Sequence, residues 1–302
     1  MKITSTSVNS LTPTPKVQKS NEVSTAKSTS TKQEHSQSKS GFSSQVQLLN
    51  LAKQFIVDGA FSSTVKKESL EERAHKRDRY VILRKQQNLE TIIQKAIQYC
   101  SDTSITDRAD VDWFNSFTEL AEGISNPTMQ ELWAKILAFE VTKPGTFSLK
   151  TLKAFKTMSV GEAKLFAKAC LLAVRDNSRK SLRIISGSSQ LPGMLNFFSK
   201  SRLTKINLGK FGLSYAELLT LADNHLLFIQ ETETPPISVG EELHFYCNNA
   251  PITFTAIKGN CLLSFYKFTP IGAELANLIS DTIDDEYLHL VKSTVSAHFS
   301  SR

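Results

Sequence analysis

Lysine and arginine residues between positions 143 and 210 give this sequence its strongest chemical signal. The block holds 14 Lys and Arg against 2 Asp and Glu, a net charge of +12, whereas residues 41–142 carry −2 and residues 211–302 carry −7. Cations that recur every three or four residues share a helix face, where they can neutralise phosphates. The candidate nucleic-acid-binding residues are therefore Lys150, Lys153, Lys156, Lys164, Lys168, Arg175, Arg179, Lys180 and Arg183.

Two features restrain this interpretation of the basic block. The expected recognition helix, residues 214–225, contains Glu217 and Asp223 but no Lys or Arg, whereas a helix that reads the major groove normally presents basic or amide side chains. The acidic blocks on both sides could also neutralise the basic block, within a monomer or across a dimer. Two interpretations stay open: sequence-non-specific contact with nucleic acid, and a structural charge seam.

Residues suited to metal binding or catalysis are sparse. His244 and Cys247 with Cys261 supply three metal ligands, one fewer than a structural zinc site takes, and the two cysteines are explained more simply as small core residues. The sequence has no Gly-rich phosphate loop and no Gly-x-Ser-x-Gly elbow. We therefore expect no metal, no cofactor and no enzymatic activity.

Carboxylates offer one further candidate. Most of the acidic residues between 102 and 122 precede or start a helix. There their negative charges interact favourably with the helix dipole and with solvent. Glu140 follows an apolar stripe at the end of a predicted helix, so it is either a buried acid or the partner of a nearby Lys or Arg. We favour the ion pair.

Apolar residues beside cations form a third candidate surface. The stretch 191–198 includes Phe197 and Phe198 and is followed by Lys200, Arg202 and Lys205, a composition that could lie on an anionic membrane. A loop that docks its phenylalanines into the core explains the same residues, and it is the interpretation we favour.

Helical periodicity dominates the first two thirds of the chain. Apolar residues predict a short helix that ends near Gly59, and a longer, highly charged helix over residues 66–99. Further helices follow around residues 111–124, after the cap Asn126-Pro127, after Ser148, and after the capping box formed by Ser159 and Glu162.

The C-terminal third has a different pattern. A capping box at Ser214 and Glu217 opens a helix, and β-like runs follow at residues 226–230, at 243–247 or 252–257, and at 262–268. Thr269-Pro270 caps another helix, and a last helix includes Tyr287 and Val295. The expected fold class is therefore mainly α (α+β): a helical core and a C-terminal winged-helix-like part with a small antiparallel hairpin.

Length and composition bound the remaining possibilities. The 302 residues are 40% hydrophobic with a net charge of +7, which excludes a wholly disordered chain, a collagen-like fibre and a polytopic membrane protein. Four widely spaced cysteines and the lack of a signal-peptide pattern predict a reduced, cytoplasmic protein. We expect a disordered basic arm at 1–44, a helical arm at 45–100, a helical core at 101–185 and the winged-helix-like part at 186–302.

Four regions resemble motifs of one uncharacterised bacterial family. They are residues 84–90, residues 112–114 with 121–126, residues 132–140 with 144–152, and residues 268–275. The resemblance covers roughly residues 66–290, and Arg84-Lys85 stands where we expect Arg-Arg. The family is a domain of unknown function that is distantly similar to Abi-alpha-type abortive-infection proteins. It implies a loose phage-defence context and no catalytic residues.

Together these observations predict a non-enzymatic cytoplasmic interaction protein that forms a homo-oligomer and binds an unidentified protein partner. The alternatives are a sequence-non-specific nucleic-acid-binding protein that uses the 143–210 block, and an effector on anionic membrane surfaces.

Overall fold

The structure, a computed structural model, describes residues 43–59, 61, 68–100, 108–192, 202–247, 250–279 and 282–302. The chain divides into two units, residues 1–54 and residues 55–302. Nearly all of the predicted disordered arm and most of the 191–198 stretch lie outside the described residues.

The described residues of the first unit form one helix, α1 (Ser44–Gln54), which has no buried residue. Its side chains Val46, Leu48, Leu49 and Leu51 are all exposed. A helix of 11 residues gains little stability from its own hydrogen bonds in water. Its apolar side therefore has no packing partner within the described part of its own unit.

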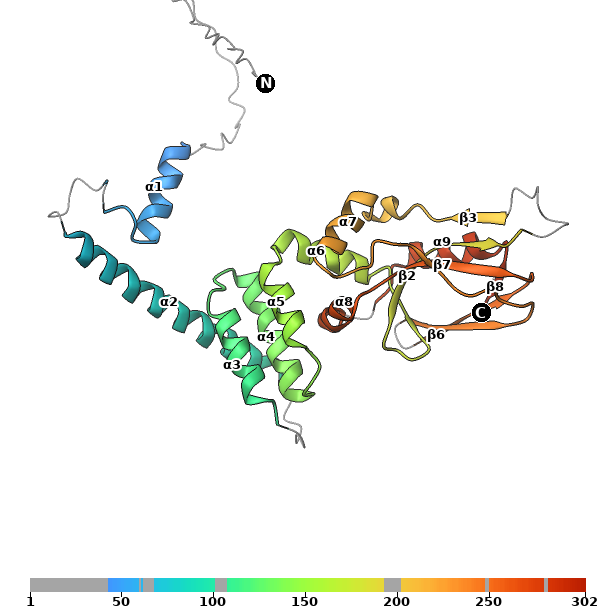
Figure 1. Ribbon diagram of the computed structural model, residues 1–302, viewed down its shortest axis with the longest axis horizontal. Helices are drawn as coiled ribbons and strands as arrows, with labels where there is room; N and C mark the ends of the chain where they lie inside the picture. The colour runs from blue at the N-terminus through green and yellow to red at the C-terminus, as the bar shows by residue number, and fades with distance from the viewer. Residues whose placement is uncertain are drawn as a thin grey trace, which may run out of the picture. The chain divides into compact units, whose positions relative to one another are not determined.

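The second unit begins with five helices (Figure 1). They are α2 (Leu70–Tyr99), α3 (Val111–Ala121), α4 (Pro127–Thr142), α5 (Leu149–Thr157) and α6 (Val160–Cys170). The predicted caps are confirmed: Asn126 caps α4 with Pro127 in its first turn, and Ser159 and Glu162 form a capping box at α6. Ser148 caps α5, and its hydroxyl accepts a hydrogen bond from the main-chain NH of Thr151.

Aromatic rings hold the helical part together. Trp113 stacks on Phe117, Phe117 meets the edge of Trp133, and Trp133 contacts Phe155, with neighbouring ring centroids 5.3–5.4 Å apart. All four side chains are buried, and rings in such contacts stabilise a core beyond their area alone. Trp133, which has no exposed surface, therefore belongs to the core of the helical part.

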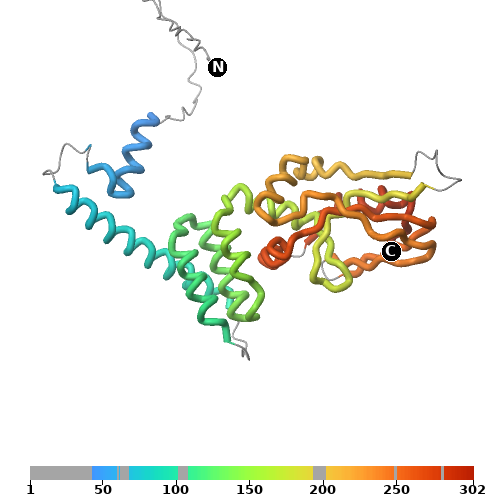
Figure 2. The backbone as a smooth tube through the Cα atoms, viewed as in Figure 1, coloured from blue at the N-terminus to red at the C-terminus, as the bar shows by residue number. Residues whose placement is uncertain are grey.

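The rest of the chain is built around one antiparallel sheet (Figure 2). Its eight described strands follow the order β4-β7-β2-β1-β5-β6-β8, and β3 pairs with β2. The bounds are β1 (Val174–Asp176), β2 (Leu182–Gln190), β3 (Leu203–Lys205), β4 (Thr232–Glu233), β5 (Glu242–Cys247), β6 (Ala250–Ala256), β7 (Cys261–Lys267) and β8 (Phe299–Ser301).

Short helices connect and cover these strands. They are the 3₁₀ helix η2 (Leu208–Phe211), α7 (Tyr215–Asp223), α8 (Pro270–Leu275), the 3₁₀ helix η3 (Ala276–Leu278) and α9 (Asp285–Val295). The fully buried Tyr287 of α9 donates a 2.7 Å hydrogen bond from its hydroxyl to the carbonyl oxygen of Ile185, which fixes α9 against β2. Buried residues of the helices and of the sheet form one continuous core.

The prediction of a mainly helical chain with a winged-helix-like part and a small hairpin is wrong. The sheet begins at Val174 and includes β2, where no strand was predicted, while residues 226–230 contribute only an isolated bridge at Leu227. Strands β5 and β6, predicted as alternatives, both form and pair with each other. Helix α7 is therefore attached to a broad sheet and is no recognition helix beside a small wing.

Within the described residues, no helix is both long enough and apolar enough to cross a membrane.

Candidate functional site

The nine cations predicted from the sequence are distributed over two helices and one hairpin. Two exposed pairs lie on different helices, Lys150 and Lys153 on α5, and Lys164 and Lys168 on α6. The other five are Lys156 at the α3–α5 contact and four residues of the β1–β2 hairpin, namely Arg175, Arg179, Lys180 and Arg183. Residues that are close in the sequence therefore lie on three different elements of the fold.

Lys156 makes its contacts within the helical part. Its Nζ donates to the main-chain carbonyl oxygen of Leu120 and lies beside Glu122 and Lys85. Burial lowers the pKa of Lys156, the carboxylate of Glu122 opposes that effect, and the charge of Lys85 adds to it. This lysine helps to join α5 to the end of α3.

Two arginines of the hairpin make contacts within the sheet. Arg183 lies 3.6 Å from a carboxylate oxygen of Asp176 and packs over the ring of Phe265, with 4.6 Å between the guanidinium carbon and the ring centroid. Arg179 packs in the same way over Tyr246 at 4.4 Å, and its side chain stays exposed. Arg179 and Lys180, both exposed, are the cations that the hairpin presents to solvent.

One groove brings cations and aromatic rings together. It consists of two hollows of about 380 and 240 Å³ that share Phe139, Asn277 and Ile279. We call it the α4 groove. Its remaining lining residues are Tyr99, Lys135, Ala138, Thr142 and Leu278 in the first hollow, and Lys143, Thr146 and Arg175 in the second.

Helix geometry explains how α4 lines this groove. Lys135, Phe139 and Lys143 follow one another at four-residue intervals, which places them along one side of the helix and just past its end. That side is separate from the stripe through Trp133 and Ile136, which is buried in the core. Lys135 and Phe139 were not predicted as site residues, because the apolar stripe of α4 indicates only its buried side, although their four-residue spacing with Lys143 is visible in the sequence.

The groove has a positive lining and two partly exposed rings. Tyr99 and Phe139 are 44% and 43% exposed, and Lys135 Nζ lies 5.4 Å from the centroid of the Tyr99 ring. No carboxylate is found among the described lining residues. Glu131, next to the groove, accepts hydrogen bonds from the Tyr99 hydroxyl and, at 2.6 Å, from Lys95, so its charge is already compensated.

The stretches that resemble family motifs meet inside the helical part. The side-chain amide of Asn88 donates to the carbonyl oxygen of Glu122 at 2.8 Å and to the hydroxyl of Ser125 at 3.1 Å. Gln130 Nε2 donates to Asn88 Oδ1 at 3.2 Å and to the carbonyl oxygen of Ile124 at 2.9 Å. Asn88 and Gln130 are both buried, so these residues fix the packing of α2, α3 and α4.

Glu140 is a buried acid without the predicted ion pair. It is 2% exposed, and its carboxylate oxygens accept hydrogen bonds from the main-chain NH groups of Gly145, at 2.6 Å, and Phe147, at 2.9 Å. Trp113 donates from its indole nitrogen to the carbonyl oxygen of Phe147 at 2.7 Å. Backbone amides thus satisfy the carboxylate where a Lys or Arg was predicted, and they order the α4–α5 turn.

The predicted metal-ligand candidates do not assemble. His244 Nδ1 lies 3.1 Å from the hydroxyl of Thr253, and Cys261 is fully buried in β7. In the part of the chain that the structure describes, no three His, Cys, Asp or Glu side chains are close enough to share a metal ion.

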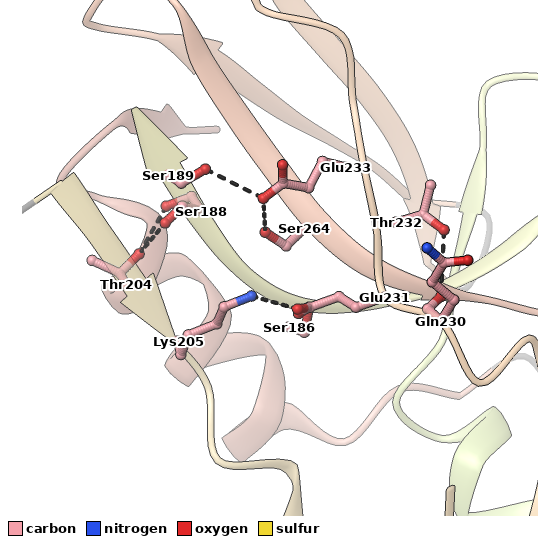
Figure 3. Close-up of polar contacts among 10 residues, drawn as sticks. All are labelled: Ser186, Ser188, Ser189, Thr204, Lys205, Gln230, Glu231, Thr232, Glu233 and Ser264. Carbon is pink, nitrogen blue, oxygen red and sulfur yellow. Dashed lines mark hydrogen bonds and ion pairs between the residues drawn. The ribbon is translucent and has the colours of Figure 1, made fainter. Parts of the chain in front are cut away.

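A second group of polar side chains lies along β2, β3 and the neighbouring β4–β7 edge (Figure 3). Lys205 pairs with Glu231 at 2.6 Å, and the hydroxyl of Ser186 donates to the same carboxylate. Further along, Ser188 contacts Thr204 at 2.9 Å, and Ser264 donates to Glu233 at 3.2 Å. No motif in the sequence pointed to this group, because its members come from four separate strands and loops.

Comparison with known proteins identifies a family and nothing closer. No curated protein and no solved structure matches the chain. The model of one family, described as a protein of unknown function (DUF2806), matches residues 72–292, which include every motif region named above. The chain therefore belongs to the DUF2806 family, a family of proteins of unknown function.

Proposed function

We propose that this chain is a non-catalytic interaction protein that binds single-stranded nucleic acid in the α4 groove without reading its sequence. The observation that carries the proposal is the lining of that groove. Lys135, Lys143 and Arg175 share it with the partly exposed rings of Tyr99 and Phe139, and its described lining holds no carboxylate.

Electrostatics supports a polyanionic ligand. Three cations along one groove, with Arg179 and Lys180 on the hairpin that also carries Arg175, can follow a chain of phosphates. Phosphate neutralisation releases counterions, so such binding needs no base contacts and weakens as salt rises. Lys150, Lys153, Lys164 and Lys168 remain predictions of the same kind on other surfaces.

The aromatic rings favour a single strand over a duplex. Unpaired bases can stack on Tyr99 and Phe139, and base–aromatic stacking contributes about 1–3 kcal/mol per base. The bases of a duplex are already stacked on one another, so only its phosphates could use the groove. Asn277 adds an amide that can hydrogen-bond to a base edge.

The test is binding of the full-length chain to fluorescein-labelled single-stranded RNA and DNA of mixed sequence, followed by fluorescence anisotropy at several salt concentrations. Replacing Lys135, Lys143 and Arg175 together by Gln should weaken binding at least about tenfold. The slope of log K against log salt is negative, and its magnitude should fall by about 2, since each phosphate contact on a single strand contributes about 0.7. Tyr99→Ser with Phe139→Ser should weaken binding by a similar factor and leave the slope unchanged.

Lys258→Gln is the matched control. Lys258 lies in the β6–β7 turn, at the opposite end of β7 from the residue that pairs with Arg183. Affinity that falls equally in the control and the triple variant would overturn the proposal. So would an acidic polypeptide such as poly-glutamate that binds in the groove while the oligonucleotides do not, because this outcome would assign the groove to a protein partner.

The likeness to abortive-infection proteins rests on motif resemblance alone. It predicts that cells expressing the chain form fewer phage plaques than cells with an empty vector. If the groove acts in that defence, the triple Gln variant should lose the protection while the Lys258→Gln control keeps it.

A further inference from the structure

A second pocket, of about 350 Å³, lies where β2, β3, η2 and α7 meet. Its polar lining includes Ser186, Lys205, Tyr215, Glu231 and Tyr266. We propose that this pocket, which we call the Glu231 pocket, binds the vicinal diol of a neutral sugar ring. The ring would belong to a free monosaccharide or to the ribose of a nucleoside.

The charged pair in this pocket suits hydroxyl groups. Lys205 Nζ lies 2.6 Å from one carboxylate oxygen of Glu231, and the two side chains remain 42% and 31% exposed (Figure 3). A hydroxyl group both donates and accepts hydrogen bonds. One hydroxyl of a diol can therefore donate to Glu231 while its neighbour accepts from Lys205, and the pair stays compensated.

The backbone of β2 is shaped to hold these side chains. The β2–β7 pairing shifts register between Ile185 and Gly187, so Ser186 sits in a β-bulge. Bulges redirect side chains and are frequent next to functional sites. Ser186, only 3% exposed, donates a hydrogen bond from its hydroxyl to Glu231 and so fixes the position of the carboxylate.

Gly187 brings the strand that carries Lys205 close to β2. A Cβ atom at this position would lie 2.2 Å from the carbonyl oxygen of Thr204, so any side chain here would clash with the backbone of β3. Glycine therefore permits the close β2–β3 pairing that places Lys205 opposite Glu231.

Two tyrosines complete the pocket. Tyr215, at the start of α7, is 69% exposed and offers a ring face for the C–H side of a sugar or for a nucleoside base. Burial, followed by the charges of Glu231 and Tyr215, raises the pKa of Tyr266. Its phenol thus stays protonated at neutral pH and can exchange hydrogen bonds with a neutral ligand.

Net charge decides the class of ligand. The charged side chains among the described lining residues are one Lys and one Glu that already pair with each other, so an anion or a cation would have to separate them. A neutral polyol leaves the pair intact. The volume is within the range of about 300–1,000 Å³ that small-molecule pockets usually have.

The experiment is calorimetric titration of the full-length chain with D-ribose, adenosine and 2′,3′-dideoxyadenosine. We expect ribose, adenosine or both to bind, and the dideoxynucleoside, which lacks the diol, to bind at least about tenfold more weakly than adenosine. Ribose that binds as well as adenosine would identify a free sugar as the ligand, whereas much tighter adenosine would identify a nucleoside. Failure of both diols to bind, or equal binding of the dideoxynucleoside, would overturn the proposal.

Variants locate the site. Glu231→Gln and, separately, Tyr215→Ala should each weaken diol binding at least about tenfold, whereas the exposed control Glu119→Gln on α3 should not. Tyr215 is a surface residue, so its variant keeps the test valid if Glu231→Gln fails to fold. Diol binding that survives Tyr215→Ala unchanged would contradict the assignment. Because the two pockets are lined by different residues, this result does not depend on nucleic-acid binding.

Discussion

Asn88 on α2 donates its side-chain amide to the carbonyl oxygen of Glu122, the residue that caps the C-terminal end of α3, at 2.8 Å. Asn88 is 6% exposed, and Gln130 of α4 donates to its side-chain oxygen. One buried amide therefore joins three helices, and its partners lie 34 to 42 residues from it in the sequence. Buried polar groups with full sets of partners specify a single packing arrangement, and removal of one partner is costly.

We predict that Asn88→Ala lowers the free energy of unfolding by about 2–3 kcal/mol, because the partners of its amide lose their hydrogen bonds while still buried. In the double variant Asn88→Ala with Gln130→Ala, the loss should be smaller than the sum of the two single losses by about 1 kcal/mol, since both substitutions break the same network. Denaturant unfolding followed by the fluorescence of Trp113 and Trp133 measures this. Gln87→Ala, at the exposed neighbouring position, should change stability by less than about 0.5 kcal/mol. Strict additivity of the Asn88 and Gln130 losses would contradict the network.

Gly272 should be intolerant of any side chain. A Cβ atom there would lie 2.1 Å from the carbonyl oxygen of Leu226, so Gly272→Ala must push α8 away from the segment that follows α7. We expect a loss of about 2 kcal/mol or more, the cost of overpacking a well-ordered contact.

Gly161→Ala is the matched control for Gly272. Gly161 lies in the first turn of α6, and the nearest atom to its added Cβ would be 3.8 Å away. Alanine is a better helix former than glycine, so stability should stay level or rise by up to about 1 kcal/mol. Thermal unfolding of both variants compares them directly, and an equal loss in the two would refute the close approach at Gly272.

Glu162 should contribute stability that depends on pH. Hydrogen bonds from the main-chain NH of Ser159, at 2.7 Å, and from the side chain of Asn224, at 2.8 Å, lower the pKa of this carboxyl below its ordinary value near 4.5. A group whose pKa falls on folding stabilises the protein fully above its unfolded pKa, and that contribution is lost as pH falls through the folded pKa.

Glu162→Gln keeps the capping geometry and removes the charge. We therefore predict a loss of about 0.5–1 kcal/mol at pH 7 that shrinks markedly when unfolding is measured near pH 3.5. The exposed Glu119→Gln serves as the reference. A deficit for Glu162→Gln that is the same at both pH values would show that its charge has no part in the stabilisation.

Capping motifs in the sequence correctly predicted where several helices begin. Asn126-Pro127, the Ser159–Glu162 box, the Ser214–Glu217 box and Thr269-Pro270 each begin a helix as predicted, because a cap and its helix lie within four residues of one another. Tertiary context has little influence on such short-range hydrogen bonds. The helical bounds of the chain are therefore largely readable without the structure.

The sheet could not be read in the same way. Strand β2 carries Ser186, Gly187, Ser188 and Ser189 in positions where a buried strand normally shows apolar residues. These serines are compatible with burial because Glu231, Thr204 and Glu233, 16 to 45 residues away, form hydrogen bonds with their hydroxyls. Long-range partners leave no local pattern, so the strand was missed and the fold class was predicted wrongly.

The candidate site, too, could be predicted only in part from the sequence. The charge count found a basic region that includes Lys143 and Arg175, but the α4 groove also needs Tyr99 from α2 and Asn277 from η3. Only the tertiary fold brings these elements together. Of the nine predicted cations, Arg175 is among the described lining residues of the groove, whereas Lys156 contacts the end of α3.

The most direct test of the central claim is photocrosslinking of the full-length chain to a single-stranded oligonucleotide that carries 4-thiouridine, with the crosslinked residues identified by mass spectrometry. Thiouridine bonds to side chains in direct contact with the base, so we predict crosslinks at Tyr99 and Phe139 that high salt suppresses. The triple Gln variant of Lys135, Lys143 and Arg175 should lose them, and Lys258→Gln should retain them. Crosslinks confined to residues 1–42, or to the exposed lysines of α5 and α6, would contradict binding in the α4 groove.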